Sequence, residues 1–586
     1  MRKSRIALFI ALSAGAQFRS AAFAEKPASC HKGHVDAGYK MTPMPAPKLM
    51  TGIGSSSLKI TTKSPAAQAY FSQGIQLLHC FWDFEAYRAF KEAARLDPEA
   101  AMAWWGIARS IGDYKAMESE KTAALDKAEK LMEHASDQER YYLRAQKQQQ
   151  DTMDNQDNKD NEDDATREME ALVDKYPDDT DAKLFLAISS ASGYDPDGRP
   201  KKGAWYPRLI LNEILAKNPD NAAANHYLIH VLEDGPHAED ALHSADILGG
   251  LAPASGHMVH MPGHIYYKLG DHAKAREAFL ASMNVDEAYM KREHVASRDD
   301  WNYAHNLSYL IASDAEAGRY IEALEMAAKL DRLPANPFLA VGRPTHATTI
   351  GAATSRLQIR FGNWQAVIDH PVSLGDPKLA GVPARAYRDG LLAYARGMRA
   401  LESNDVEKAA READALDALQ WRLKSDPPDV KDVSDPNADD DEEENGKPDK
   451  VFDLLETASL DLRGNLQCAK GDFDQGIALL RKAAAKEKKD IGYNEPPTYS
   501  RPEAESLGYA YLRNKQFEKA RVSFENELKQ RPHSGHALYG IARSYELAGK
   551  TGAASLAYDK FLQAWSNADP DLPMISHARS VQTNHH

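Results

Sequence analysis

Small and apolar residues recur along most of the chain at helical spacing, and the pattern itself repeats. Small residues let two helices approach closely, and a proline ends a helix because it cannot donate a backbone hydrogen bond. Counting 34 residues on from Gly74 reaches Ala108, and Pro219 and Pro253 are also 34 residues apart. The pattern predicts pairs of antiparallel helices that repeat about every 34 residues. The first unit carries it at Gly74, Ala86, Phe90, Ala93 and Pro98.

Later units keep the same pattern of small, aromatic and closing residues. No stretch shows the alternation of apolar and polar residues that is typical of a half-buried strand. We therefore predict an all-α solenoid of roughly eight to ten helix pairs, wound into a right-handed superhelix. The clearest later matches are Gly263, Tyr266, Ala275 and Phe279, and then Gly508, Tyr511, Ala520, Phe524 and Pro532.

Two acidic stretches lack periodic apolar positions, and they divide the chain. Residues 151–164 read DTMDNQDNKDNEDD and predict an exposed loop, and residues 425–450 predict a linker or a long loop. The predicted organisation is a signal peptide (1–24), an extended or disordered leader (25–64), an N-terminal solenoid (65–424) with the acidic insertion near 151–164, an acidic linker (425–450), C-terminal helix pairs (451–567) and a tail (568–586).

The N-terminus has the three parts of a secretory signal. Residues 2–5 are rich in basic side chains, residues 6–16 are mainly apolar, and residues 22–24 read Ala-Phe-Ala. This arrangement predicts export to the periplasm or secretion, with cleavage after Ala24. No later apolar run approaches the ~18 residues that span a bilayer, so we expect no stable membrane span after cleavage.

Charge and cysteine content exclude some kinds of partner and fold. The formal net charge is −14 and the pI is about 5.9, which argues against a nucleic-acid partner because such proteins carry a basic face. Only Cys30, Cys80 and Cys468 are present, so the fold cannot depend on a disulfide framework.

Histidines gather in residues 225–270, which hold seven of the 21 in the chain. His226 and His260 are 34 residues apart, as are His230 and His264, so each pair occupies equivalent places in consecutive units. Because neighbouring helices pack at ~8 to 10 Å, we expect these side chains to converge.

The repeat is typical of the tetratricopeptide repeat (TPR). Two segments resemble a group of bacterial secreted TPR proteins of undefined function: QAYFSQGIQLLHCFWDFEAYRAFKEAARLDPEAAMAWWGIARS, and the pair NHYLIH and GHMVHMPGHIYYKLG. The resemblance covers residues 65–360 and implies that the first helix of each unit lines a concave groove. Its groove candidates are His226, His230, Glu233, His257, His260, His264 and His305 for a metal, and Trp105, Arg109 and His79, with Lys268 nearby, for another ligand.

Three interpretations of the histidines stay open. In the first, the histidines are polar residues of the scaffold. In the second, they are ligands of a transition metal such as zinc, copper or iron, with Glu233 as a further ligand or as a base. Alternatively, they form a pH-dependent groove for an anion or peptide, because histidine titrates near pH ~6.5. Tyr227 stands where the metalloprotease motif HExxH has its glutamate.

The sequence thus predicts an exported TPR scaffold that binds a partner protein, peptide or small ligand in its groove, with a metal ion held by the groove histidines. The alternative is a metal-dependent enzyme, a hydrolase or oxidoreductase, with its active site in that groove. No nucleophile elbow, phosphate loop or CxxC motif supports a named reaction, and no catalytic residue is assigned.

Overall fold

The computed structural model describes residues 44, 46–112, 117–154, 160–195, 198–334, 351–372, 382–425, 450–491 and 501–583. The predicted signal peptide, half of the predicted leader and Cys30 lie outside these residues, as does nearly all of the predicted acidic linker.

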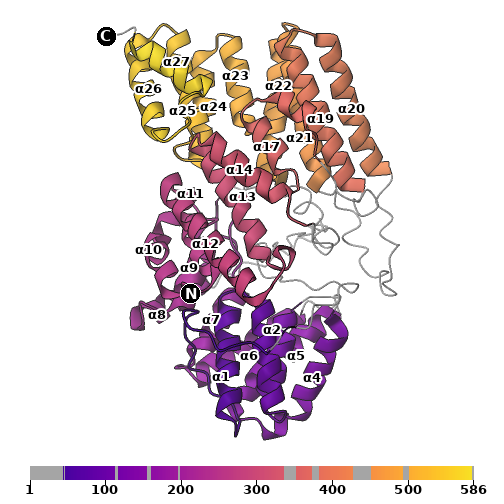
Figure 1. Cartoon of the computed structure of the whole chain (residues 1–586), viewed down its shortest axis with the longest axis vertical. Helices are drawn as coiled ribbons and strands as arrows, with labels where there is room; N and C mark the ends of the chain where they lie inside the picture. The colour runs from indigo at the N-terminus through magenta and orange to yellow at the C-terminus, as the bar shows by residue number, and fades with distance from the viewer. Residues whose placement is uncertain are drawn as a thin grey trace, which may run out of the picture.

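Consecutive antiparallel helix pairs build the first part of the chain (Figure 1). They are α1 (Pro65–His79) with α2 (Asp83–Leu96), α3 (Ala101–Ile111) with α4 (Glu118–Lys130), α5 (Asp137–Asp154) with α6 (Asp160–Lys175), α7 (Thr180–Ser189) with α8 (Trp205–Lys217), α9 (Ala222–Leu232) with α10 (Leu242–Leu251), α11 (Gly256–Lys268) with α12 (His272–Glu293), and α13 (Trp301–Glu316) with α14 (Tyr320–Asp331).

The later part of the chain continues in the same way. Its pairs are α17 (Ala353–Arg360) with α18 (Trp364–Asp369), α19 (Val382–Glu402) with α20 (Val406–Ser425), α21 (Lys450–Ala469) with α22 (Phe473–Lys486), α23 (Glu503–Arg513) with α24 (Phe517–Gln530), and α25 (Gly535–Leu547) with α26 (Thr551–Ala564), followed by α27 (Pro573–Thr583).

The predicted all-α solenoid is confirmed. The described residues contain no β-strand, only an isolated bridge between Tyr194 and Pro200. No helix in this part of the chain is both long enough and apolar enough to cross a membrane.

More helix pairs are present than the eight to ten that the repeat count gave. The difference includes the acidic region, where a loop was expected over 151–164 but α5 extends to Asp154 and α6 begins at Asp160. Tyr142 on α5 and Leu172 on α6 are buried, so each helix is anchored by an apolar side and its acidic end continues the same helix.

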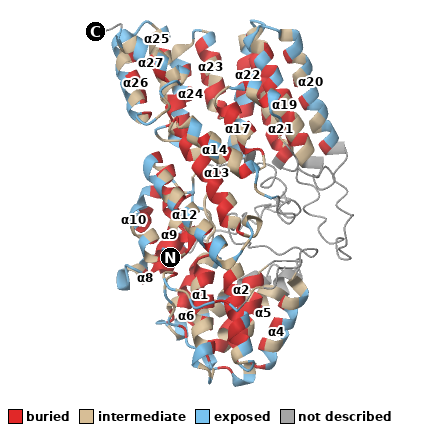
Figure 2. Cartoon of the chain, in the orientation of Figure 1, coloured by how far each residue is buried: buried red, intermediate tan, exposed pale blue. Residues whose placement is uncertain are grey.

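The repeat signature follows from packing inside each pair. A Cβ at Gly263 of α11 would lie 2.3 Å from Phe279 Cε1 of α12, and one at Gly74 would lie 2.4 Å from Phe90 Cε1. The aromatic ring therefore occupies the space beside the glycine. Buried residues accordingly line the faces where helices meet (Figure 2).

The C-terminal helices pack back against the middle of the solenoid (Figure 1). The Trp565 indole Nε1 donates to the Glu316 carbonyl at 2.8 Å, and the Asp569 amide donates to the Gly318 carbonyl at 3.0 Å. Arg360 of α17 also bonds to both Glu316 and Glu505. These contacts join α13 to helices more than 180 residues later in the chain.

Candidate metal centre

The histidines lie on α9, α11 and α13, which are the first helices of three consecutive pairs. Each helix starts at a capping residue whose side chain accepts a backbone amide: Asn221, Ser255 and Asp300. His226, His260 and His305 each stand five residues after their cap. The shared start therefore places the three rings at the same height in neighbouring helices.

His226, His230 and His257 form the first three-histidine group. The His226 Nε2 lies 3.1 Å from the Nε2 of His257 and 3.1 Å from the Nε2 of His230. One ring nitrogen from each residue can be chosen so that all three lie within 4.8 Å of one another. Such a set can share one ion.

His260, His264 and His305 form the second three-histidine group by the same criterion. The Nε2 atoms of His260 and His264 are 2.8 Å apart. The His305 ring centroid lies 5.0 Å from that of His260 and 6.1 Å from that of His264. The predicted convergence of the metal candidates thus resolves into two groups.

Glu233 lies between the two groups. Its Oε1 accepts from His230 Nδ1 at 2.7 Å, and its Oε2 accepts from His264 Nδ1. The carboxylate therefore contacts the outer nitrogens of the rings, the position of a residue that orients metal ligands.

Three more Nδ1 atoms, those of His226, His257 and His260, also face oxygen acceptors. His226 Nδ1 bonds to the His79 carbonyl at 2.8 Å, and His260 Nδ1 bonds to Asn306 Oδ1 at 2.7 Å. His257 Nδ1 bonds to Asn302 Oδ1 at 3.3 Å. Since carbonyls and carboxylates only accept, these Nδ1 atoms carry the hydrogen.

Further contacts fix the two asparagine amides. Asn302 Nδ2 donates to Asp286 Oδ2 at 2.7 Å, and Asn306 Nδ2 donates to the Phe279 carbonyl at 2.8 Å. The amide oxygens must therefore point at the histidines. A neutral ring that donates from Nδ1 has a lone pair at Nε2, so the converging Nε2 atoms form clusters of acceptors.

Burial keeps the rings of His257 and His260 neutral. Burial, reinforced by the neighbouring histidines, lowers the pKa of His257 well below its usual range, and burial with His264 does the same to the pKa of His260. Burial alone would raise the pKa of Glu233, but His264 and His230 hold it below its usual value. The centre combines neutral imidazoles at His257 and His260 with the Glu233 carboxylate, a combination that suits a cation.

Aromatic rings cover the histidines, so they do not line an open groove as expected. The Phe81 centroid lies 4.5 Å from that of His226 and 5.1 Å from that of His230. Trp301 packs on His257 and His305 at 5.1 and 5.6 Å. Water is thereby largely excluded from the ring nitrogens.

The residues proposed for another ligand lie elsewhere. Trp105 is buried against Tyr142 and Phe185 in the core, and Arg109 donates to Gln149 Oε1 at 2.9 Å. Lys268 is half-buried at the C-terminal end of α11. Binding roles for these residues stay predictions.

His79 is also buried, and its ring is engaged on both sides. Nδ1 lies 2.9 Å from the Tyr227 hydroxyl and Nε2 lies 3.0 Å from Asp181 Oδ1. The neighbouring Cys80 is buried too, which raises its pKa to about 12 and keeps it a thiol. His79 supports the centre through its backbone carbonyl instead.

Sequence reasoning missed Asn302 and Asn306. The sequence held a sign of their position, because both lie close to His305 on α13. Asn302 stands two residues after the cap of α13, as His257 stands two residues after the cap of α11. Their role depends on bonds across two helices, which residue spacing does not reveal.

Comparisons with known proteins agree with this architecture. Residues 506–569 match the family model for the tetratricopeptide repeat. The fold is a TPR solenoid. No curated protein matches this sequence significantly.

Three solved structures align with most of the chain at low sequence identity. Human IFIT1, solved as a dimer with m7Gppp-AAAA, is 14% identical over 86% of this chain and 91% of that chain, with a TM-score of 0.32. Yeast Tom70 is 13% identical over 89% and 96%, with a TM-score of 0.25. A chain of the APC/C hetero-tetramer Cut9–Hcn1 is 13% identical over 77% and 96%, with a TM-score of 0.23.

Proposed function

We propose that this TPR solenoid binds transition-metal ions, zinc, copper or iron, through its two three-histidine groups. The observation that carries the proposal is the convergence of Nε2 atoms whose rings donate from Nδ1 to oxygens. Lone pairs that face one another at about 3 Å repel. A cation between them removes this repulsion, because each lone pair then donates to the cation. The donor set is the one these metals prefer.

The spacing of the nitrogens fits an ion. Bonds of ~2.0 to 2.1 Å from zinc to histidine in a tetrahedral arrangement set the nitrogens roughly 3.3 Å apart. The separations of 3.1 Å in the first group and 2.8 Å in the second are close to that value. Small rotations of the rings supply the remainder.

Each protein residue has a distinct part in the proposed centre. Each of the six histidines presents one ring nitrogen to an ion, and Glu233, Asn302, Asn306 and the His79 carbonyl hold five of the six rings in place. When bound, such an ion supplies Lewis acidity to whatever donor fills its remaining coordination position.

The centre sits in a scaffold suited to partner binding. Stacked helix pairs create extended concave surfaces, and we propose that a protein or peptide occupies this one. The net charge of −14 favours a neutral or basic partner. The signal-like residues 2–24 support the proposal that the protein acts outside the cytoplasm.

Elemental analysis of the purified protein tests the metal proposal. The protein is supplied with zinc, copper or iron, dialysed and assayed for bound metal. We expect His226→Ala/His230→Ala to lose the metal of the first group and His260→Ala/His264→Ala to lose that of the second. His243→Ala is the control, because His243 is exposed on α10. Wild-type protein without stoichiometric metal under all three supplies would overturn the proposal.

A further inference from the structure

Phe81 lies at a turn position that is occupied mostly by glycine in the equivalent turns. Its φ is +54°, in the left-handed region, between Cys80, the C-cap of α1, and Trp82, the N-cap of α2. The Phe81 amide donates to the Leu78 carbonyl at 3.0 Å, and the Trp82 amide donates to the Leu77 carbonyl at 2.9 Å. In the described part of the chain, seven other helix pairs have a turn with the same two hydrogen bonds and a positive φ. At this position they carry Gly270, Gly318, Gly362, Asn404, Gly471, Lys515 and Gly549.

A bulky residue is poorly suited to this position. The left-handed conformation brings the Cβ of an L residue close to the following carbonyl oxygen, a contact that glycine avoids. Asn404 and Lys515 are exposed, whereas Phe81 is only 3% exposed. A strained residue persists only where the surrounding structure holds it, and such residues gather at functional sites. The reason for a phenylalanine here therefore lies in what its ring contacts.

The Phe81 ring contacts all three histidines of the first group. Its centroid lies 4.5 Å from that of His226, 5.1 Å from that of His230 and 5.5 Å from that of His257. The three histidine centroids are themselves 4.8 to 5.8 Å apart, so the Phe81 ring lies over one face of the triangle that they form. An ion bonded to the three rings lies close to this triangle and therefore beside the Phe81 ring.

Further contacts hold the turn between α1 and α2 against the helices near these histidines. The His79 carbonyl accepts from His226 Nδ1 at 2.8 Å, and the Trp82 ring packs on Tyr289 of α12 at 4.6 Å. The Tyr289 hydroxyl donates to Glu85 Oε1 of α2 at 2.5 Å. The histidine rings thus lie between this turn and the helices that carry them. Displacement of the turn uncovers the first group on the side away from α9 and α11.

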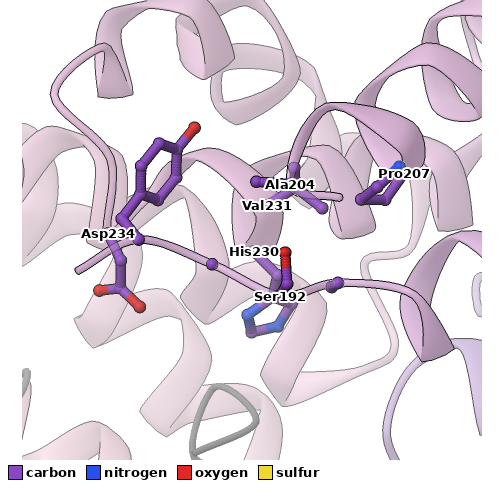
Figure 3. Close-up of a pocket in the computed structure, with 9 residues that line it drawn as sticks. Ser192, Ala204, Pro207, His230, Val231 and Asp234 are labelled. Atoms are coloured by element: carbon purple, nitrogen blue, oxygen red, sulfur yellow. The ribbon is translucent and has the colours of Figure 1, made fainter. Parts of the chain in front are cut away.

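A small pocket lies beside His230 (Figure 3). It touches the first group at His230 alone, and its lining also includes Tyr194 and Asp234. Both ring nitrogens of His230 already face other side chains, Glu233 and His226. The pocket therefore does not open onto the place where the three Nε2 atoms meet, and it gives an ion no route to them.

We infer that Phe81 is the lid of the first group: an ion enters and leaves when the turn between α1 and α2 moves the Phe81 ring off the three histidines. Burial of the ring favours the closed turn, whereas the left-handed φ opposes it, so opening relieves strain. The second group is covered by Tyr309 instead, whose ring centroid lies 4.3 Å from that of His264. Its exchange of ions should not depend on Phe81. This inference rests on the proposed function.

The rate of zinc release tests this inference in the full chain. Zinc-loaded His260→Ala/His264→Ala, which keeps the first group, is mixed with an excess of a zinc-chelating dye, and absorbance follows the release. We expect the addition of Phe81→Gly to speed release roughly 10-fold or more, because a buried phenylalanine ring no longer holds the turn closed. Glycine adopts the left-handed conformation without strain, so the turn itself is kept.

Two further variants serve as controls. Lys515→Gly is the matched control, because Lys515 is exposed and occupies the equivalent turn position between α23 and α24. It relieves the same backbone strain in the C-terminal part of the chain and should leave the rate of release unchanged. Phe81→Leu keeps an apolar side chain over the histidine rings and should release zinc more slowly than Phe81→Gly.

The second group shows whether Phe81→Gly merely loosens the fold. In His226→Ala/His230→Ala, which keeps only the second group, Phe81→Gly should not change the rate of zinc release. Faster release there as well would overturn the inference. A wild-type protein that binds no zinc overturns the proposed function and this inference together. Bound zinc that leaves the first group equally fast with and without Phe81 overturns the inference alone.

Discussion

Glu233 is the residue through which the two histidine groups are linked. One carboxylate oxygen accepts from His230 and the other accepts from His264, and the side chain is largely buried. The sequence suggested a ligand or base, but both oxygens are engaged by Nδ1 atoms. Its contribution is to orient one ring in each group.

Glu233→Gln should weaken zinc binding by both groups. The glutamine amide has only one acceptor oxygen, which can serve either His230 or His264. Its NH2 group would then face the Nδ1 hydrogen of the other ring, and two donors cannot form a hydrogen bond. Loss of such an orienting partner typically costs 10- to 100-fold in metal affinity. Competition with a chelator measures it, and Glu239→Gln, whose carboxylate contacts the exposed His237, is the control. Unchanged affinity in both groups would show that the carboxylate does not orient the rings.

His536 is a buried histidine outside the two groups, and it makes stability depend on pH. Its ring packs against Phe361 and Trp565 at 5.2 Å, and burial, with the charge of Arg360, lowers its pKa to about 4. The unfolded chain titrates near ~6.5. Because the unfolded state then binds more protons, stability is full above pH ~6.5 and falls as the pH drops toward 4.

His536→Gln should flatten this dependence. Between pH 7 and 5 the wild-type protein should lose about 2 kcal/mol more free energy of unfolding than the variant. Urea denaturation at the two pH values measures the difference. His243→Gln changes an exposed histidine and should keep the wild-type slope. Equal slopes for His536→Gln and wild type would contradict the expectation.

At the scale of one element, α11 shows how the repeat supports the centre. The helix runs through Pro262 without ending there, so His260 and His264 lie one turn apart on one helix. The helix begins directly after Ser255, so Pro262 lies in its interior. Gly263, directly before His264, allows the Phe279 ring to pack against the backbone.

Gly263→Ala should destabilise the protein by about 1–3 kcal/mol, because the new methyl group would overlap the Phe279 ring. The displacement should also weaken metal binding by the second group. Gly249→Ala is the control: its Cβ would meet nothing closer than 4.0 Å, and it should stabilise α10 by about 0.5–1 kcal/mol. Thermal unfolding compares the two, and a shift of the same sign in both would contradict the packing argument.

At the scale of the whole molecule, Arg360 holds distant helix pairs together. Its guanidinium bonds to Glu316 of α13 and to Glu505 of α23, and all three side chains are buried. Burial would raise the pKa of both carboxyl groups, but Arg360 holds each pKa below its usual value. Both remain charged and depend on this partner.

Arg360→Met should cost about 3–5 kcal/mol, because it leaves two buried carboxylates without their cation. We expect the C-terminal helices to unfold at lower urea concentration than the N-terminal ones. Arg399→Met removes an exposed pair with Glu402 and should change stability by less than about 1 kcal/mol. A single transition at the wild-type midpoint in Arg360→Met would exclude this role.

The sequence by itself determined the repeating helix pairs and the register of the histidines. Both are local properties: glycine and phenylalanine spacing follows from packing within one pair, and His226 and His260 are related by one repeat. The expectation that these rings face one another therefore needed only the repeat length.

Only the tertiary structure decided how the candidates divide and what surrounds them. The split into two groups, the bonds from Asn302 and Asn306, and the cover provided by Phe81 depend on side-chain directions across three helix pairs. The return of Trp565 to Glu316 depends on small rotations summed over many repeats. The sequence period determines the packing of each helix pair on the next. Contacts between distant helix pairs depend instead on the curvature accumulated over all the pairs between them.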